Sequence, residues 1–368
     1  MQVPKKLPFK DFFCIILQME KVLVALSGGV DSSTTAYLLK QQGYEVAALT
    51  LKLYNSCTKT SVSLQAIEDS KKVCDFLGIK HYVLDLRQEF KDEIIENFIS
   101  SYLSATTPNP CILCNKKIKF GLLLDHMQKL GFDYLATGHY AKIENIDGEY
   151  KLKLGKDKSK DQTYFLYKLT QKELAKIMFP LADLTKEEIR KISADAGLPV
   201  AHKPDSQEIC FIETTYHDFL QKNIKDFNKK VIPGRIVNTD GKVLGKHKGL
   251  IYYTIGQRSG LGITTPEPVY VLRMDKATNT LVIGTKKEVF SRVAKLKDIT
   301  FVSDNKKNND FKAKVKIRRM HTPAVATVSG DIVLFDEPQA SVTPGQSAVF
   351  YEGDYVIGGG IIKAMYNV

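Results

Sequence analysis

The sequence predicts an α/β fold, in which a doubly wound parallel sheet is followed by a small β-rich central domain and a C-terminal β-barrel. Three observations lead to this fold class. Apolar, β-rich runs alternate with helical patterns in the first half of the chain. Glycine follows two of those helical patterns, as it does at helix ends. After Cys210 the pattern changes to short strands separated by glycine turns.

Four segments of the first half are expected to be strands, because each is nearly continuously apolar, as strands covered on both faces are. They are 21–26, 45–53, 80–86 and 132–138. Three helical patterns lie between them. The first two end at Gly43 and Gly78, and the third reads EFKDEIIENFISSYLS. This alternation predicts the doubly wound sheet.

The segment from Lys151 to Pro199 is predicted to be a helical extension of the first domain. TQKELAKIMFP and TKEEIRKISADAGLP each begin with threonine, a favoured N-cap, and carry acidic residues in the first turn.

Two small β domains are expected after this extension. Asp240-Gly241 between β-rich runs is a hairpin signal, and past about Phe290 short alternating strands recur and predict a barrel. A start codon assigned upstream of Met19 would explain the first residues as an extension. The chain is therefore divided into an N-terminal extension, an α/β domain with its helical extension, a central β-rich domain and a C-terminal barrel, at 1–18, 19–212, 213–285 and 286–368.

Composition limits the class of partner and compartment. The formal net charge of +12 favours a polyanion or a phosphorylated substrate, without choosing among RNA, DNA, membrane and nucleotide. Six cysteines are too few for a disulfide scaffold, and no cleavable secretory signal is present, so a cytoplasmic protein is expected. The apolar segment 12–17 is far shorter than the ~20 residues of a membrane-spanning helix, so no membrane association is expected.

The segment SGGVDSS (27–33) joins the first strand to the first helix and is predicted to bind an anion through backbone N–H groups and serine hydroxyls. Gly28 and Gly29 allow close backbone approach. Asp31 is unusual at an anion site, and suggests a divalent cation or an adenylation step. A glycine pair alone indicates only a turn, but the complete string is more specific, and it lacks the Gly-Lys-Ser/Thr of a Walker A loop.

Three cysteines are candidates for chemistry. Cys111 and Cys114 stand in TPNPCILCNKKIKF (107–120) at a predicted helix start with lysines nearby, which favours their thiolates. Cys210 lies at the junction with the β region. Zinc is disfavoured because no second close Cys or His pair exists. An iron–sulfur cluster on the three cysteines and a persulfide carrier with a resolving thiol both stay open.

The remaining cysteines are interpreted as unreactive. Cys57 and Cys74 are expected to be small buried hydrophobes or surface thiols, and Cys14 falls in the extension.

Seven separated motifs in one order carry a family resemblance: SGGVDSS, TPNPCILCNKKIKF, ATGHYAKI, KDQTYFL, KPDSQEICFI, HKGLIYYTIGQRSGLGI and TPGQSAVFY. The first resembles the PP-loop of the ATP pyrophosphatase superfamily. Together they resemble the tRNA-specific 2-thiouridylase family, from Met19 to the C-terminus. The resemblance implies an ATP-dependent sulfurtransferase that forms 2-thiouridine at the wobble uridine of tRNAs for lysine, glutamate and glutamine.

The resemblance also implies site residues and cofactors. The family adenylates the C2 oxygen and then delivers sulfur, with Mg²⁺ offsetting phosphate charge. By position, Cys210 would hold the persulfide and Cys114 would release the sulfur, leaving a Cys114–Cys210 disulfide. ATP would be bound by Ala25, Leu26, Ser27, Gly28, Gly29, Val30, Asp31, Ser32, Leu51 and Gly138.

The implied partners are tRNA and a sulfur-donor protein, a cysteine desulfurase or a sulfur relay protein that loads Cys210; a monomer is expected. His139 at a strand end and Arg318 and Arg319 on a solvated strand face also have purely structural interpretations. The residues that would contact tRNA are Asn109, Pro110, Cys111, His139, Lys160, Asp161, Gln162, Arg318, Arg319 and Gln346.

Two positions depart from the family pattern. Many members carry Asp where Cys111 stands, so Cys111 is interpreted as a base contact, a spare thiol or a cluster ligand. KIRRMH (316–321) replaces the expected Lys-Ile-Arg-Tyr-Arg-His, which weakens the assignment of single arginines. The rival functions are a PP-loop thiolase with an iron–sulfur cluster, a PP-loop ligase or amidotransferase acting on a small metabolite, and an RNA-binding protein with a vestigial nucleotide site.

Overall fold

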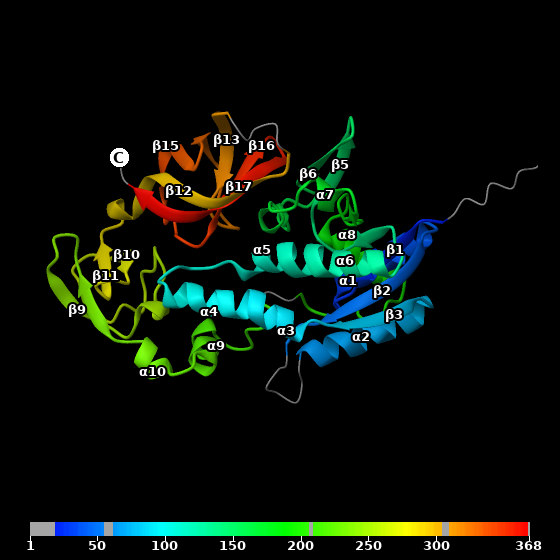
Figure 1. Ribbon diagram of the computed structural model, residues 1–368, viewed down its shortest axis with the longest axis horizontal. Helices are drawn as coiled ribbons and strands as arrows, with labels where there is room; N and C mark the ends of the chain where they lie inside the picture. Colours follow the sequence, from blue (N-terminus) through cyan, green and yellow to red (C-terminus); the bar gives the residue numbers. More distant parts are fainter. Residues whose placement is uncertain (1–18, 55–61, 206–208, 304–308, 367–368) are drawn as a thin grey trace, which may run out of the picture.

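The structure is a computed structural model that describes residues 19–54, 62–205, 209–303 and 309–366 (Figure 1). The predicted extension 1–18, with Cys14, lies outside the described residues, and so does Cys57. Within the described ranges, no helix combines the length and the apolar character that crossing a membrane requires.

The first half of the chain forms the predicted parallel sheet. All five strands are parallel, in the order β3-β2-β1-β4-β7, so β2 and β3 are added on one side of β1 and β4 and β7 on the other, with the switch in strand order between β1 and β4. Four strands agree with the sequence prediction. The fifth, β7, lies where a helix was predicted, because two residues that pair with β4 leave no periodic signal. The strands are β1 Lys21–Ala25, β2 Glu45–Lys52, β3 Lys80–Asp85, β4 Tyr134–Ala136 and β7 Ile177–Met178.

Helices cover both faces of this sheet. In β1, Val22 and Val24 pack in one buried cluster with helices α1 and α2, whereas Leu23 packs in another with α6. Alternate residues of a strand point to opposite faces, so a continuously apolar strand fits this arrangement. The helices are α1 Val30–Gln41, α2 Val62–Leu77, α6 Leu123–Lys129 and α8 Lys186–Asp195.

Two of the longer helices contain π turns. α3 (Arg87–Phe90) continues through a π turn at Lys91–Ile95 into α4 (Glu96–Leu103). α5 (Pro110–Cys114) continues through a π turn at 115–122 into α6. The two helical rods lie side by side, and α5 carries two of the candidate cysteines (Figure 1). π turns often occur at functional sites.

The predicted helical extension is only partly correct. Its first three residues instead end strand β6 (Glu149–Lys153), which forms a β-hairpin with the preceding β5 (Lys142–Ile146), and the turn between the two strands places Asp147 and Gly148 at φ of 53° and 85°. Helices follow at α7 (Gln171–Leu174) and α8, each behind a threonine capping box as predicted. β6 pairs with β17, so the hairpin extends the C-terminal sheet rather than the first domain.

The central region is a four-stranded sheet of order β10-β11-β8-β9. The Asp240-Gly241 hairpin joins β8 to β9 as predicted. Two helices that the sequence did not predict precede this sheet, α9 (Tyr216–Asn223) and α10 (Phe227–Lys230). The strands are β8 Gly234–Val237, β9 Val243–His247, β10 Tyr270–Asp275 and β11 Thr280–Gly284.

The C-terminal region is the predicted barrel. Six antiparallel strands follow the order β12-β15-β14-β13-β16-β17, and β12 also pairs with β17, which closes the barrel around an apolar core. The strands are β12 Phe290–Phe301, β13 Phe311–Lys316, β14 Ala324–Ser329, β15 Ile332–Ala340, β16 Ser347–Glu352 and β17 Tyr355–Tyr366.

Candidate active site

The SGGVDSS loop lies at the carboxyl end of β1, next to the switch in strand order between β1 and β4. Ligands of open α/β sheets bind at this position. Helix α1 begins at Val30, and its N-cap Gly29 provides no side-chain cap, so the N–H groups of the first turn stay available. The loop therefore has the geometry of an anion site.

Two glycines are needed for the shape of this loop. Gly28 has φ of +68°, and a Cβ there would lie 2.7 Å from the Ala66 carbonyl oxygen. A Cβ on Gly138, just after β4, would lie 2.9 Å from Asp31 C and Ser32 N. Gly138 thus packs directly on the loop backbone, which agrees with its predicted place in the nucleotide site.

The loop serines form hydrogen bonds mainly with other atoms of the loop. Ser27 and Ser32 hydroxyl oxygens lie 3.1 Å apart, and the Ser27 N–H donates to Ser32 Oγ at 3.2 Å. Ser33 is fully buried and donates to the Gly29 carbonyl at 2.8 Å, so it shapes the turn and is not a ligand donor as the sequence suggested. Ala25 and Leu51 lie at the ends of β1 and β2 next to the loop.

Asp31 belongs to a partly exposed ionic network in which, of the charged residues, only Lys186 is buried. Its Oδ1 accepts from Lys186 Nζ at 2.6 Å and from the Tyr140 hydroxyl at 2.8 Å. Lys186 also lies 2.8 Å from Asp205, which pairs with Arg190 and, at 3.4 Å, with Lys160. This chain of charges connects the loop to the segment that leads to Cys210.

Lys203 makes a second connection to the same segment. Its ammonium donates to the Gly28 carbonyl at 3.0 Å and to Asp69 Oδ2 at 2.7 Å. These bonds hold the pKa of Asp69 below its usual value, against the opposing effect of its burial. In KPDSQEICFI the sequence pointed only to the cysteine. The signal for this second connection is the pair of charged residues at the start of that motif, Lys203 and Asp205.

The structure places the three candidate cysteines near one another. Burial of its thiol raises the pKa of Cys210 to about 12, and the nearby Cys114 and Cys111 add to that rise, although the residue as a whole is exposed. Burial likewise raises the pKa of Cys114 to about 11. The expectation that the helix start favours the thiolates is therefore wrong for the free enzyme, because burial outweighs the positive charges.

The flanking lysines explain part of this difference. Lys116 pairs with Glu173 at 2.9 Å and Lys117 with Glu93 at 3.8 Å, so the charge of each ammonium is already offset by a carboxylate. Lys119 alone of these three lowers the pKa of both Cys114 and Cys210.

His139 lies beside the same centre. Its Nδ1 lies 2.7 Å from Thr137 Oγ1, and its ring contacts Phe120 and Phe179. Burial and the neighbouring Lys119 hold its pKa well below the usual value, so the ring is neutral near pH 7.

The predicted tRNA contacts divide into two groups. Asp161 is buried, accepts from Thr163 and pairs with Lys316 at 3.6 Å, and Gln162 accepts from the Tyr140 backbone, so both hold the protein together. Arg318 and Arg319 are exposed.

Gln346 connects the barrel to the cysteine helix. Its side-chain amide donates to the Thr107 carbonyl at 2.9 Å, and the Thr107 N–H donates to the Pro344 carbonyl at 3.0 Å. Asn109 and Pro110 follow at the start of α5, where Pro110 is buried. The turn at 343–346 thus fixes the loop that leads to Cys111.

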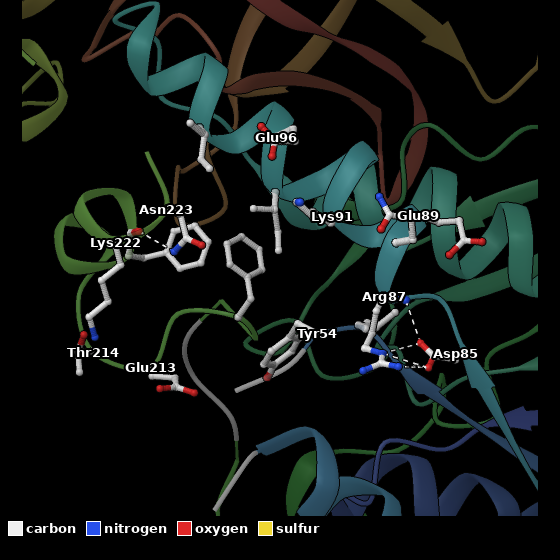
Figure 2. Close-up of a pocket in the computed structure, with 16 residues that line it drawn as sticks. Tyr54, Asp85, Arg87, Glu89, Lys91, Glu96, Glu213, Thr214, Lys222 and Asn223 are labelled. Carbon is white, nitrogen blue, oxygen red and sulfur yellow. Dashed lines mark hydrogen bonds and ion pairs between the residues drawn. The ribbon is translucent and has the colours of Figure 1, made fainter. Parts of the chain in front are cut away.

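An open pocket of about 950 Å³ is lined by residues of α3, α4 and α9 and by the chain just after β2 (Figure 2). Tyr54 lines it and donates its hydroxyl to the Cys210 carbonyl, and Phe211 lines it from the residue after Cys210. Asp85 and Arg87 pair across its edge at 2.6 Å. It contains none of the predicted ATP, cysteine or tRNA residues, so it is separate from the site.

The described residues also bear on whether a metal site is present. Within those ranges, no group of three or more His, Cys, Asp or Glu side chains is arranged to hold a metal ion. The three cysteines are near enough to influence one another, but they do not form such a group.

Family models match almost the whole chain in sequence order. They are a tRNA methyl transferase HUP domain at residues 20–214, a tRNA methyl transferase PRC-barrel domain at 217–285 and an aminomethyltransferase beta-barrel domain at 291–362.

Curated relatives match at similar length. The tRNA-specific 2-thiouridylase MnmA of Halothermothrix orenii is 45% identical over 94% of this chain and 99% of its own, and that of Clostridium botulinum strain Alaska E43 is 46% identical over 95% and 99%. Among solved structures, the U34-tRNA thiolase NcsA of Methanococcus maripaludis, with its [4Fe-4S] cluster, is 21% identical over 57% of this chain and 66% of its own, with a TM-score of 0.35. That likeness is too small to extend the cluster to this chain.

Proposed function

The chain belongs to the tRNA-specific 2-thiouridylase family, and we propose that it uses ATP to replace the C2 oxygen of a tRNA uridine with sulfur. The identity of about 45% over nearly the full length carries this conclusion. The geometry agrees with it, because Lys203 bonds to the anion loop, Asp205 pairs with Lys186 of its ionic network, and Cys210, a few positions later in the sequence, lies near the other two thiols. We further propose the wobble uridine of tRNAs for lysine, glutamate and glutamine as the target.

The first chemical step is adenylation of the uridine. A carbonyl oxygen is a poor leaving group, and transfer of AMP from ATP to the C2 oxygen, with release of pyrophosphate, makes it a good one. The N–H groups at the start of α1 would hold the phosphates, and Lys186 and Lys203 supply positive charge beside them. Asp31 is the carboxylate suited to hold Mg²⁺, which would offset phosphate charge when bound.

The second step transfers sulfur. The outer sulfur of a Cys210 persulfide attacks C2, AMP leaves, and a Cys210–S–S–C2 bridge remains. The Cys114 thiolate then attacks the Cys210 sulfur and breaks the S–S bond. Both electrons of that bond stay on the transferred sulfur, which remains bonded to C2. The products are 2-thiouridine and a Cys114–Cys210 disulfide, so the two thiols supply the two electrons, and a thiol reductant resets the enzyme.

We propose separate roles for the residues around the thiols. His139 is neutral and would act as a hydrogen-bonding neighbour of the flipped base, beside Asn109 to Cys111. Arg318, Arg319 and Lys160 would contact phosphates at the rim. Asp161, Gln162 and Gln346 would position these elements rather than contact tRNA, because their side chains are bonded within the protein.

Pyrophosphate release provides the test of this function. With ATP and unmodified tRNA, we expect release of pyrophosphate that depends on the tRNA, and with a persulfide donor we expect thiolated tRNA, seen as retarded migration in a mercury-containing gel. A small metabolite ligase would release pyrophosphate without tRNA, and an RNA-binding protein with a vestigial site would release none.

Replacement of Cys111 by aspartate separates the persulfide and cluster mechanisms. We expect the Cys111→Asp variant to keep thiolation within about threefold of the wild type, because aspartate stands at this position in many relatives and the two transferring thiols remain. The measurement is thiolated tRNA per enzyme, together with iron content. Loss of activity along with bound iron and absorbance near ~400 nm would favour a thiolate-ligated cluster instead.

Three further assignments concern the sulfur donor, the oligomeric state and the compartment. We propose that a protein carrying a persulfide, a cysteine desulfurase or a sulfur relay protein, loads Cys210. We also propose that the enzyme acts as a monomer in the cytoplasm.

A further inference from the structure

We propose that Lys119 is the cation that holds the anionic sulfur during transfer between Cys210 and Cys114. The inference rests on the proposed function, because it assigns a residue to the sulfur step. Lys119 would contact the sulfur atoms through its ammonium and would therefore be a catalytic residue rather than a support for the helix.

The first observation is that Lys119 has no ion-pair or hydrogen-bond partner among the residues that the structure describes. Its helix neighbours Lys116 and Lys117 each pair with a glutamate. Lys119 is half-buried, yet across the part of the chain that the structure describes it forms no ion pair or hydrogen bond. Placing an ammonium in partly desolvated surroundings without a counterion is unfavourable, so such a group is expected to meet an anion from the reaction.

The second observation is its place on the helix. Cys114 ends α5 and Lys119 lies five residues later, inside the π turn at 115–122. A π turn has i→i+5 hydrogen bonds, so residues five apart lie over one another on one face, whereas in a regular α-helix that pair diverges. The π turn thus brings the lysine onto the side that carries the thiol.

The third observation is that four titrating groups respond to this lysine. Its positive charge lowers the pKa of Cys111, Cys114 and Cys210, against the larger opposite effect of burial, and it also lowers the pKa of His139. The ammonium is therefore near enough for its charge to act on all three thiols and on the candidate base contact. Arg319 acts on Cys111 alone of these thiols, and it is exposed.

The sulfur chemistry gives this charge a use. Burial makes the thiols neutral near pH 7, but each step proceeds through an anion: the persulfide before it attacks C2, the Cys114 thiolate before it attacks sulfur, and the leaving sulfur afterwards. The negative charge passes from sulfur to sulfur within reach of one ammonium. A single fixed cation can stabilise each of these anions in turn without moving a proton itself.

The experiment compares Lys119→Met with Lys119→Arg and with Lys117→Met, a control from the same helix whose ammonium pairs with Glu93. Alkylation of Cys114 and Cys210 by iodoacetamide is followed by mass spectrometry from pH 7 to 10 in the free enzyme. Loss of the charge should raise the thiol pKa values and slow alkylation at pH 8 by about 3- to 10-fold, with Lys119→Arg restoring most of the rate.

Single-turnover sulfur transfer from preloaded Cys210 provides the functional readout. We expect Lys119→Met to slow it by at least about tenfold while tRNA-dependent pyrophosphate release stays within about twofold. Thermal melting checks folding, and Lys119→Gln takes the place of the methionine variant if that variant unfolds. Equal alkylation and transfer in the Lys119 and Lys117 variants would overturn the assignment. A wild-type enzyme that makes no thiolated tRNA would instead overturn the proposed function.

Discussion

Replacement of Cys210 or Cys114 by serine is expected to reduce thiolated tRNA by at least about a thousandfold, because both thiols take part in bond changes that a hydroxyl cannot perform. Serine at 210 cannot carry a persulfide, and serine at 114 is not ionised near neutral pH and is a poor nucleophile toward sulfur. Pyrophosphate release should continue in both variants, since the ATP loop is untouched.

The two variants should stop at different points. With Cys114→Ser, the Cys210–S–S–C2 bridge has no resolving thiol, so a protein–tRNA adduct should accumulate that dithiothreitol cleaves. With Cys210→Ser no adduct should form. Cys74→Ala is the control, because Cys74 is buried under the sheet, away from the site. Full thiolation by either serine variant would rule out the two-thiol mechanism.

Replacement of Gly138 by alanine is expected to have the second large effect, a fall of about a hundredfold in tRNA-dependent pyrophosphate release. The new Cβ would lie 2.9 Å from the backbone of Asp31 and Ser32, and backbone atoms cannot move aside as a flexible side chain can. The start of α1 must shift instead, and a displacement of about 1 Å at reacting groups costs on the order of 10²-fold in rate.

A glycine elsewhere provides the control for this substitution. Gly148, in the β5–β6 turn, has φ of +85° and nothing within 4 Å of an added Cβ. Gly148→Ala should therefore cost some stability through backbone strain but leave pyrophosphate release unchanged. If Gly138→Ala behaved in the same way, the loop would not be the place where ATP reacts.

The fold was predictable where its signals are local. Apolar runs predicted β1 to β4, threonine caps predicted α7 and α8, and an Asp-Gly pair predicted the β8–β9 turn. The signals failed where partners distant in the sequence decide the structure. The β5–β6 hairpin has its own local signal, Asp147-Gly148 in the turn, which was overlooked, whereas its pairing with β17 depends on residues about two hundred positions later.

The sequence predicted which residues make up the site better than it predicted the pKa values of its thiols. The motifs located the loop and the cysteines, and the structure brings the cysteines together. The prediction of favoured thiolates failed because burial is a property of the fold, which a cysteine beside lysines does not reveal. The sequence suggested a divalent cation or an adenylation step for Asp31 but could not reveal its partner Lys186, which comes from a distant helix.

The attachment of the β5–β6 hairpin and of Thr107 to the barrel bears on how the chain matures. Strand β17 and the turn at 343–346 are synthesised last, so the loop before Cys111 lacks its anchor until the ribosome has finished nearly the whole polypeptide. A nascent chain can complete its parallel sheet early, yet it acquires the cysteine geometry only at the end. Sulfur chemistry is thereby withheld from unfinished chains.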